Sequence, residues 1–262
     1  MFLIGERING MFTDVKKAIE NRDKEPIQEL ARDQVEAGAD ALDINVGPAM
    51  GDDVDNMVWL VETAQEATDT TLCLDVAKYD VMGEALDACK NPTIINSTKA
   101  IEEQLEKYVA LATETDSGLI ALTINEDGVP NDAEARVQMG ATIAAKAMEG
   151  GLAMDDLYVD PVILPVNVAP KQPTQVLDAL NQLKVLSDPP PNFMLGLSNV
   201  SQGCRDRSLL NRTYVAMAIG AGLNAALLDV LDEDLVNSVI TAEVLMERQL
   251  YCDDFVSAYL SS

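Results

Sequence analysis

The chain has 262 residues, 48% of them hydrophobic, so it is long and apolar enough to build a sizeable core in one large domain. Its formal net charge of −26 argues against nucleic-acid or anionic-membrane partners, because like charges repel. The chain has no histidine, which excludes a histidine-rich metal centre and a histidine-based nucleophilic triad. Carboxylates, amides, hydroxyls and a bound small molecule must therefore supply the chemistry.

The four cysteines form no C-x-x-C pair, so we expect neither a disulfide framework nor a bound metal such as zinc. Reduced thiols fit a cytoplasmic location. The first ten residues, MFLIGERING, do not resemble a signal peptide, and no run of about 18 apolar residues indicates a membrane span. The cysteines are Cys73, Cys89, Cys204 and Cys252.

Short apolar runs alternate with helical patterns from one end of the chain to the other. Continuous apolar runs of this length are typical of parallel strands that are buried on both faces. We predict strands at Phe2–Ile4, Ala41–Val46, Thr71–Leu74, Thr93–Ile95, Leu119–Ile124, Leu157–Val159, Phe193–Leu197 and Ala225–Val230.

The first predicted helix carries an apolar stripe, which begins at Ile27 and recurs at helical spacing as far as Val35. Pro26 suits the first turn of that helix, and Gly38 suits its end. Eight such strand–helix units predict one TIM barrel over residues 1–262; a doubly wound sheet is the runner-up, but no G-x-G-x-x-G follows its first strand. Further helices are predicted at 53–67, 79–89, 100–114, 131–149, 172–186, 206–221 and 233–248.

A polar or charged residue stands at the carboxyl end of every predicted strand. Active sites of such barrels lie at the carboxyl ends of the strands, so these side chains are expected to share one rim. For Asn125 and Asp229, a helix N-cap is an equally good interpretation. The rim residues are Glu6, Arg7, Asp43, Asn45, Asp75, Asn96, Ser97, Asn125, Asp160, Ser198, Asn199 and Asp229.

Aspartate carboxylates accept hydrogen bonds, and asparagine both donates and accepts them. Such a set complements a heterocycle with an amide-like or guanidine-like edge, for example a pterin. A phosphate would favour basic residues or a glycine-rich turn, whereas the rim has Arg7 early and Arg205 and Arg207 after strand seven. A neutral heterocycle is therefore preferred over a sugar phosphate.

Eight segments of the chain carry a resemblance to a known family: GERING (5–10), LDINVGPA (42–49), LCLD (72–75), INST (95–98), DLYVDPVILP (156–165), LGLSNVSQG (195–203), LNRT (210–213) and YCDDFV (251–256). They closely resemble the methyltetrahydrofolate:corrinoid (iron–sulfur) protein methyltransferase family. The resemblance covers essentially the whole chain and is most specific in DPVILP and LGLSNVSQ. It implies a TIM barrel, usually a homodimer, that binds tetrahydrofolate and exchanges a methyl group between its N5 and the cobalt of a corrinoid on a partner protein.

The resemblance also implies roles for individual residues. Asp75, Asn96 and Asp160 match the family's pterin-binding positions, Asn199 matches the asparagine that contacts N5, and Gln202 lies close to it. The departure is at 76–78, where Val-Ala-Lys replaces small polar residues, so substrate contacts just beyond the third strand are in question.

Methyl transfer from N5 needs a proton there, because the departing amine anion is otherwise very unstable. Asn199 could stabilise the proton at N5 in the transition state, while Asp75 and Asp160 orient the ring as ionised acceptors. Alternatively, one of the two carboxyls relays the proton, if burial raises its pKa. A dihydropteroate synthase-like pterin enzyme and a non-catalytic pterin-binding protein are the competing functions, and the direction of methyl transfer stays open.

Overall fold

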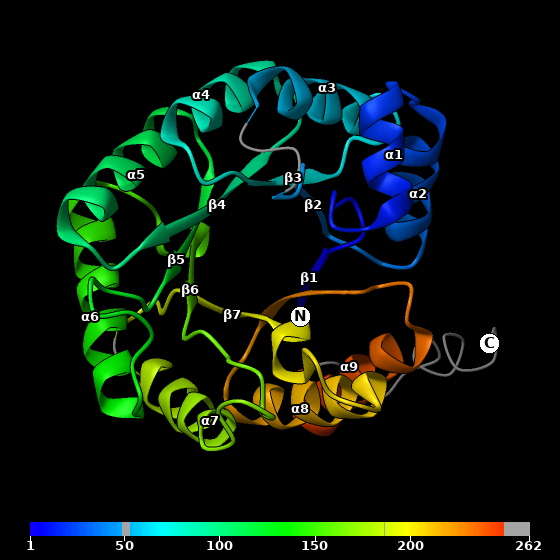
Figure 1. The fold of residues 1–262 in the computed structure, drawn as a ribbon. Helices are drawn as coiled ribbons and strands as arrows, with labels where there is room; N and C mark the ends of the chain where they lie inside the picture. Colours follow the sequence, from blue (N-terminus) through cyan, green and yellow to red (C-terminus); the bar gives the residue numbers. More distant parts are fainter. Residues whose placement is uncertain (49–52, 186, 249–262) are drawn as a thin grey trace.

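The computed structural model describes residues 1–48, 53–185 and 187–248. Eight parallel strands close into a barrel in chain order, and β8 pairs with β1 to complete the ring. The helices lie around the outside of this ring (Figure 1). The prediction of a TIM barrel is confirmed, and the closing pair excludes the open sheet.

All eight predicted apolar runs contain a strand of the barrel, and the predicted helices agree with the observed ones to within a few residues. The strands are β1 Phe2–Gly5, β2 Ala41–Ile44, β3 Thr71–Asp75, β4 Thr93–Lys99, β5 Gly118–Leu122, β6 Leu157–Asp160, β7 Asn192–Gly196 and β8 Ala225–Leu228. The α-helices are α1 Thr13–Asn21, α2 Glu25–Glu36, α3 Val54–Gln65, α4 Tyr79–Ala88, α5 Glu102–Glu114, α6 Ala133–Glu149, α7 Gln172–Leu183, α8 Arg207–Ala221 and α9 Glu233–Leu245, and the 3-10 helices are η1 Met154–Asp156 and η2 Leu197–Ser201.

Helix α1 was not predicted. It lies between β1 and α2, and only Val15, Ala18 and Ile19 of its residues are buried. Three apolar positions among charged neighbours make a weak helical pattern, so the signal in the sequence was short. In α2, by contrast, Pro26 stands in the first turn and Gly38 follows the end with a φ of 98°, as predicted.

The interior of the barrel is filled by a layer of buried side chains, one from each strand. Side chains of a strand alternate between its two faces, so the residue two positions further along also points inward. This apolar layer closes the barrel below its carboxyl-terminal mouth and leaves the next layer for chemistry. Its members are Ile4, Ala41, Cys73, Ile94, Ile120, Tyr158, Met194 and Ala225.

Candidate functional site

A polar layer follows the apolar one. Two residues beyond the interior residues of β1, β2, β3, β4 and β6, the chain places Glu6, Asp43, Asp75, Asn96 and Asp160. The period of two directs these side chains towards the barrel axis at its mouth. Four carboxyl groups and one amide therefore converge where the strands end.

A cavity of about 520 Å³ opens at this mouth, and it brings together three of the five predicted site residues, Asp75, Asn199 and Gln202. Asn199 lies in η2, three residues after β7 ends, rather than at the end of the strand itself. Asn96 and Asp160 are not among the lining residues. The other lining residues are Glu6, Asn9, Met11, Phe12, Asp43, Ser198, Arg207, Ser208, Asn211, Leu227, Asp229, Asp232 and Leu235.

Asp75 is held by Asn45, which directly follows β2. The side-chain amide of Asn45 donates a hydrogen bond to the Asp75 carboxylate. The backbone carbonyl of Asn45 accepts a hydrogen bond of 2.9 Å from the backbone N–H of Gly10. Gly10 and Gly47 make this approach possible, because a Cβ on Gly10 would lie 1.9 Å from the carbonyl oxygen of Val46. Gly10 of GERING and Gly47 of NVGP therefore allow the close packing that positions the Asp75 carboxylate.

Asn96 reaches the cavity indirectly. Its amide nitrogen donates to Oδ1 of Asp43 at 3.0 Å, and Asp43 does line the cavity. Burial and the charge of Asp75 together raise the pKa of Asp43 well above its usual range. Asp43 is therefore easier to protonate than an ordinary carboxyl and lies beside Asp75 and Asn96, a role that was not predicted for it.

Asp160 is buried, with 7% of its surface exposed. Its Oδ1 accepts a hydrogen bond of 2.7 Å from the backbone N–H of Val162, and its Oδ2 accepts one of 3.4 Å from that of Gly196. Burial raises its pKa to about 6, although these two bonds oppose the shift. The carboxylate is thus fixed in orientation and titrates near neutrality.

Glu6 ties β1 to η2 at the cavity wall. The Ser198 hydroxyl donates to Oε1 of Glu6 at 2.7 Å, and Arg207 donates to the Ser198 carbonyl at 3.2 Å. Burial is the largest influence on the pKa of Glu6 and raises it. Because Ser198 directly precedes Asn199, this cluster supports the segment that carries the predicted catalytic amide. Counting two residues beyond each interior position is the sequence signal that would have singled out Glu6 and Asp43.

The helix-cap interpretation of Asn125 and Asp229 is wrong. Asn125 accepts from the N–H of Asp127, and Asp229 accepts from that of Leu231, so both stabilise tight turns. The caps of α6 and α9 are Asp132 and Asp232. Of the two turn residues, Asp229 lines the cavity.

The cavity is strongly acidic. Five acidic residues line it, and Arg207 is the basic residue among its described lining. The guanidinium of Arg207 already donates to Ser201 and to the Ser198 carbonyl. Such a wall disfavours an anionic ligand and favours a group that gains positive charge. The five are Glu6, Asp43, Asp75, Asp229 and Asp232.

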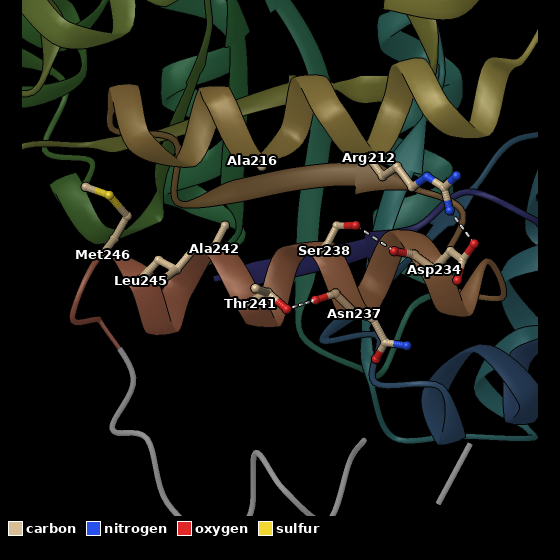
Figure 2. A pocket seen from close by; sticks show the side chains of 9 residues that line it. All are labelled: Arg212, Ala216, Asp234, Asn237, Ser238, Thr241, Ala242, Leu245 and Met246. Atoms are coloured by element: carbon tan, nitrogen blue, oxygen red, sulfur yellow. Dashed lines mark hydrogen bonds and ion pairs between the residues drawn. The ribbon is translucent and has the colours of Figure 1, made fainter. Parts of the chain in front are cut away.

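A second cavity, of about 600 Å³, lies outside the barrel between α8 and α9 (Figure 2). At one end Arg212 pairs with Asp234, whereas Leu245 and Met246 lie at the other end. It contains none of the rim residues. Although it is the larger of the two, we place the chemistry at the mouth, where the polar strand-end residues converge.

The part of the chain that the structure describes contains no group of three or more His, Cys, Asp or Glu residues arranged to hold a metal ion. Within residues 1–48, 53–185 and 187–248, no helix is both long and apolar enough to cross a membrane.

The model of the pterin binding enzyme family matches residues 8–229, which include strands β2 to β8 and the rim residues from Asp43 to Asp229. The chain belongs to this family. The methylcorrinoid:tetrahydrofolate methyltransferase of Eubacterium limosum is 26% identical over 99% of this chain and 96% of its own length. The methionine synthase of Mycobacterium tuberculosis is 25% identical over 87% of this chain, which corresponds to 20% of that longer protein.

Solved structures of dihydropteroate synthases share the fold. That of Yersinia pestis in a sulfonamide drug complex has a TM-score of 0.70 at 15% identity, covering 95% of this chain and 94% of that one. That of Xanthomonas albilineans with 4-aminobenzoic acid has a TM-score of 0.69 at 17% identity, covering 96% and 93%. The chain's resemblance to the corrinoid methyltransferases is borne out by the relatives; of the quoted segments, YCDDFV (251–256) lies outside the described residues.

Proposed function

We propose that the protein transfers a methyl group between N5 of tetrahydrofolate and the cobalt of a corrinoid carried by a partner protein. The observation that carries the proposal is the acidic cavity at the barrel mouth, where Asp75 and Asn199 face one space. Similarity over nearly the full length to a methylcorrinoid:tetrahydrofolate methyltransferase supports it.

The residues at the mouth fit a pterin. Asp75 and Asp160 offer acceptors for the N–H groups of the pterin edge, and Asn96 offers both donor and acceptor. Burial and backbone bonds hold Asp160 in place, and Asn45 holds Asp75, so binding costs little further ordering. In this proposal, these three residues anchor the ring.

The acidic cavity also suits the transfer. The cobalt(I) electron pair forms the bond to the methyl carbon, the carbon–N5 bond breaks with its pair left on N5, and the proton at N5 makes the leaving amine neutral. Positive charge at N5 is stabilised by the surrounding carboxyls. Asn199 contributes an amide oxygen that accepts a hydrogen bond from the protonated N5 in the transition state, and Gln202 stands beside it.

Two roles of the carboxyls remain in competition. We favour Asp75 and Asp160 as ionised acceptors, since an acceptor needs no tuned pKa. The pKa of about 6 at Asp160 meets one requirement of the alternative, in which this carboxyl relays the proton to N5. A rate that keeps its pH dependence in an Asp160→Asn variant excludes the relay.

The corrinoid enters as a substrate on another protein, and we propose that the mouth receives it there. A homodimeric state, a cytoplasmic location and a single domain over residues 1–262 belong to the same proposal. Light scattering of the purified protein tests the dimer.

The direct test is an assay with methyltetrahydrofolate and cobalt(I) cobalamin, followed by the absorbance of methylcobalamin. Product formation that depends on the protein supports the proposal in either direction, because a catalyst accelerates both. Folate binding without turnover would indicate a non-catalytic pterin-binding protein. Condensation of a pterin pyrophosphate with 4-aminobenzoate would indicate a dihydropteroate synthase, a function that the acidic wall disfavours because the leaving group is an anion.

A further inference from the structure

The largest fully buried side chain of the described residues is a charged one, Arg136 of α6. A buried guanidinium is costly unless its donors are satisfied. No carboxylate of the described chain forms an ion pair with it; instead it donates to four neutral oxygens. They are the carbonyls of Pro161 at 2.7 Å, Asp132 at 3.1 Å and Val162 at 3.4 Å, and Oε1 of Gln172 on α7.

Two of these acceptors belong to the turn that directly follows Asp160. Val162 in that turn has a φ of 58°, in the left-handed region that a β-branched residue rarely adopts. Its N–H is the group that donates to Oδ1 of Asp160 at 2.7 Å. The geometry of the Asp160 carboxylate thus depends on a backbone conformation that Val162 would not favour alone. Arg136 stabilises this conformation by donating to the carbonyls of Pro161 and Val162, which flank the N–H of Val162 in the chain.

We propose that Arg136 is a positioning residue for the pterin site, which locks the Asp160–Val162 turn so that the Asp160 carboxylate keeps the orientation needed to accept the pterin N–H groups. The inference rests on the proposed function, because it takes Asp160 as a pterin anchor. Each carboxylate oxygen accepts one backbone N–H, from Val162 or Gly196, and keeps a further lone pair for the ligand.

Arg136 also acts through its charge. Its guanidinium lowers the pKa of Asp160, although burial outweighs it and leaves that pKa at about 6. Arg136 from α6 is the charged side chain that shifts the pKa of Asp160. Tyr214 from α8 is the other titratable group nearby: the charge of Asp160 helps to raise the pKa of Tyr214, whose hydroxyl donates to the Pro173 carbonyl on α7. Arg136 is therefore the cation that favours the ionised, accepting form of Asp160.

Charge and geometry can be separated by two substitutions. Arg136→Met removes both, and Arg136→Lys keeps the positive charge but cannot span four acceptors with one ammonium. Ile143→Ala is the matched control. Ile143 is also fully buried on α6, but its side chain forms no hydrogen bond to the turn. Tetrahydrofolate binding is measured by calorimetry over about pH 5 to 8, together with the melting temperature.

We expect the Met variant to bind tetrahydrofolate about tenfold more weakly, which corresponds to about 1.4 kcal/mol of binding free energy. The pH midpoint of its binding should move upward, because Asp160 protonates more easily without the cation. The Lys variant should bind weakly but keep a midpoint near that of the wild type. The Ile143→Ala control should melt at a lower temperature with unchanged affinity and midpoint.

In an Asp160→Asn background, the Arg136→Lys substitution should lose most of its effect on binding, if Arg136 acts through Asp160. An undiminished effect there, or wild-type affinity in the Lys variant, overturns the positioning role; these two measurements decide the question even if the Met variant does not fold. Wild-type affinity in Asp160→Ala would instead overturn the anchor role of Asp160 itself, so the two failures are distinguishable.

Discussion

The side-chain amide of Asn96 on β4 donates a hydrogen bond of 3.0 Å to the carboxylate of Asp43 on β2. The two strands flank β3, whose last residue is Asp75, and the charge of Asp75 in turn helps to raise the pKa of Asp43. Residues of three neighbouring strands are therefore fixed relative to one another by this bond and by the bond from Asn45 to Asp75. A site ordered in this way before its ligand arrives loses little conformational entropy on binding.

The first prediction concerns this preorganised wall. Asp75→Ala should weaken tetrahydrofolate binding by about 1–3 kcal/mol, because the variant leaves the pterin N–H groups, and the amide of Asn45, without an acceptor. Asp160→Ala should have an effect of similar size. Calorimetry measures both, with Asp178→Ala on the exposed side of α7 as the control that should bind normally. Unchanged affinity in both site variants contradicts their role as anchors.

The second prediction follows from the titration of Asp160. Its pKa is about 6 in the folded chain, above the usual value of 3.8, so the folded state holds the proton more tightly than the unfolded state. Stability from this group is present at low pH and is lost as the pH rises from about 4 to about 6. Relative to Asp160→Asn, the wild type should lose about 1–2 kcal/mol of unfolding free energy between about pH 5 and pH 8.

Urea denaturation of the two proteins at several pH values measures that difference. The comparison cancels the fixed cost of replacing the carboxylate, as well as the titration of all other groups that the substitution leaves alone. Parallel stability curves for the two proteins would show that Asp160 has an ordinary pKa in the folded state.

The barrel could be predicted from the sequence because its signal is repeated. Eight apolar runs with helical patterns between them allow few arrangements, and the order of parallel strands in a closed barrel follows from the chain. The short helix α1 was not predicted, because its three buried residues do not make a clear helical period of apolar positions.

The site could be predicted only in part. Asp75, Asn199 and Gln202 line one cavity, whereas Asn96 contributes through Asp43 and Asp160 lies outside the lining. Arg136 could not be found from the sequence, since a lone arginine on a helix most often lies on a solvated face. Its importance follows from the Asp160–Val162 turn packed against it, which is a tertiary relationship.

The third prediction concerns metal content. The absence of histidine from the sequence leads us to expect that the purified protein holds neither zinc nor cobalt in stoichiometric amounts. Treatment with a chelator should leave folate binding unchanged, because the proposed anchors are carboxylates and amides that contact the ring directly. Elemental analysis after desalting, combined with calorimetry, measures both quantities. A metal that survives chelation at one equivalent contradicts the expectation.

The last prediction concerns Asn199, which shares its cavity with Asp75 and follows the Ser198 that Glu6 and Arg207 hold in place. If its amide stabilises the charge that develops at N5, its benefit is larger in the transition state than in the ground state. Asn199→Ala should then lower the rate of methyl transfer by about 10–150-fold, the value of one hydrogen bond to a charged group. Binding of unmethylated tetrahydrofolate should fall much less.

Kinetics with free cobalamin measure this effect without the partner protein. Asn237→Ala is the matched control, because Asn237 lines the outer cavity between α8 and α9 and should leave turnover unchanged (Figure 2). Near-wild-type turnover in Asn199→Ala would end the assignment of a catalytic role. A loss that weaker folate binding explains entirely would make Asn199 a further anchor, since removing an interaction that is equally strong in the ground and transition states lowers affinity without changing the rate of the bound complex.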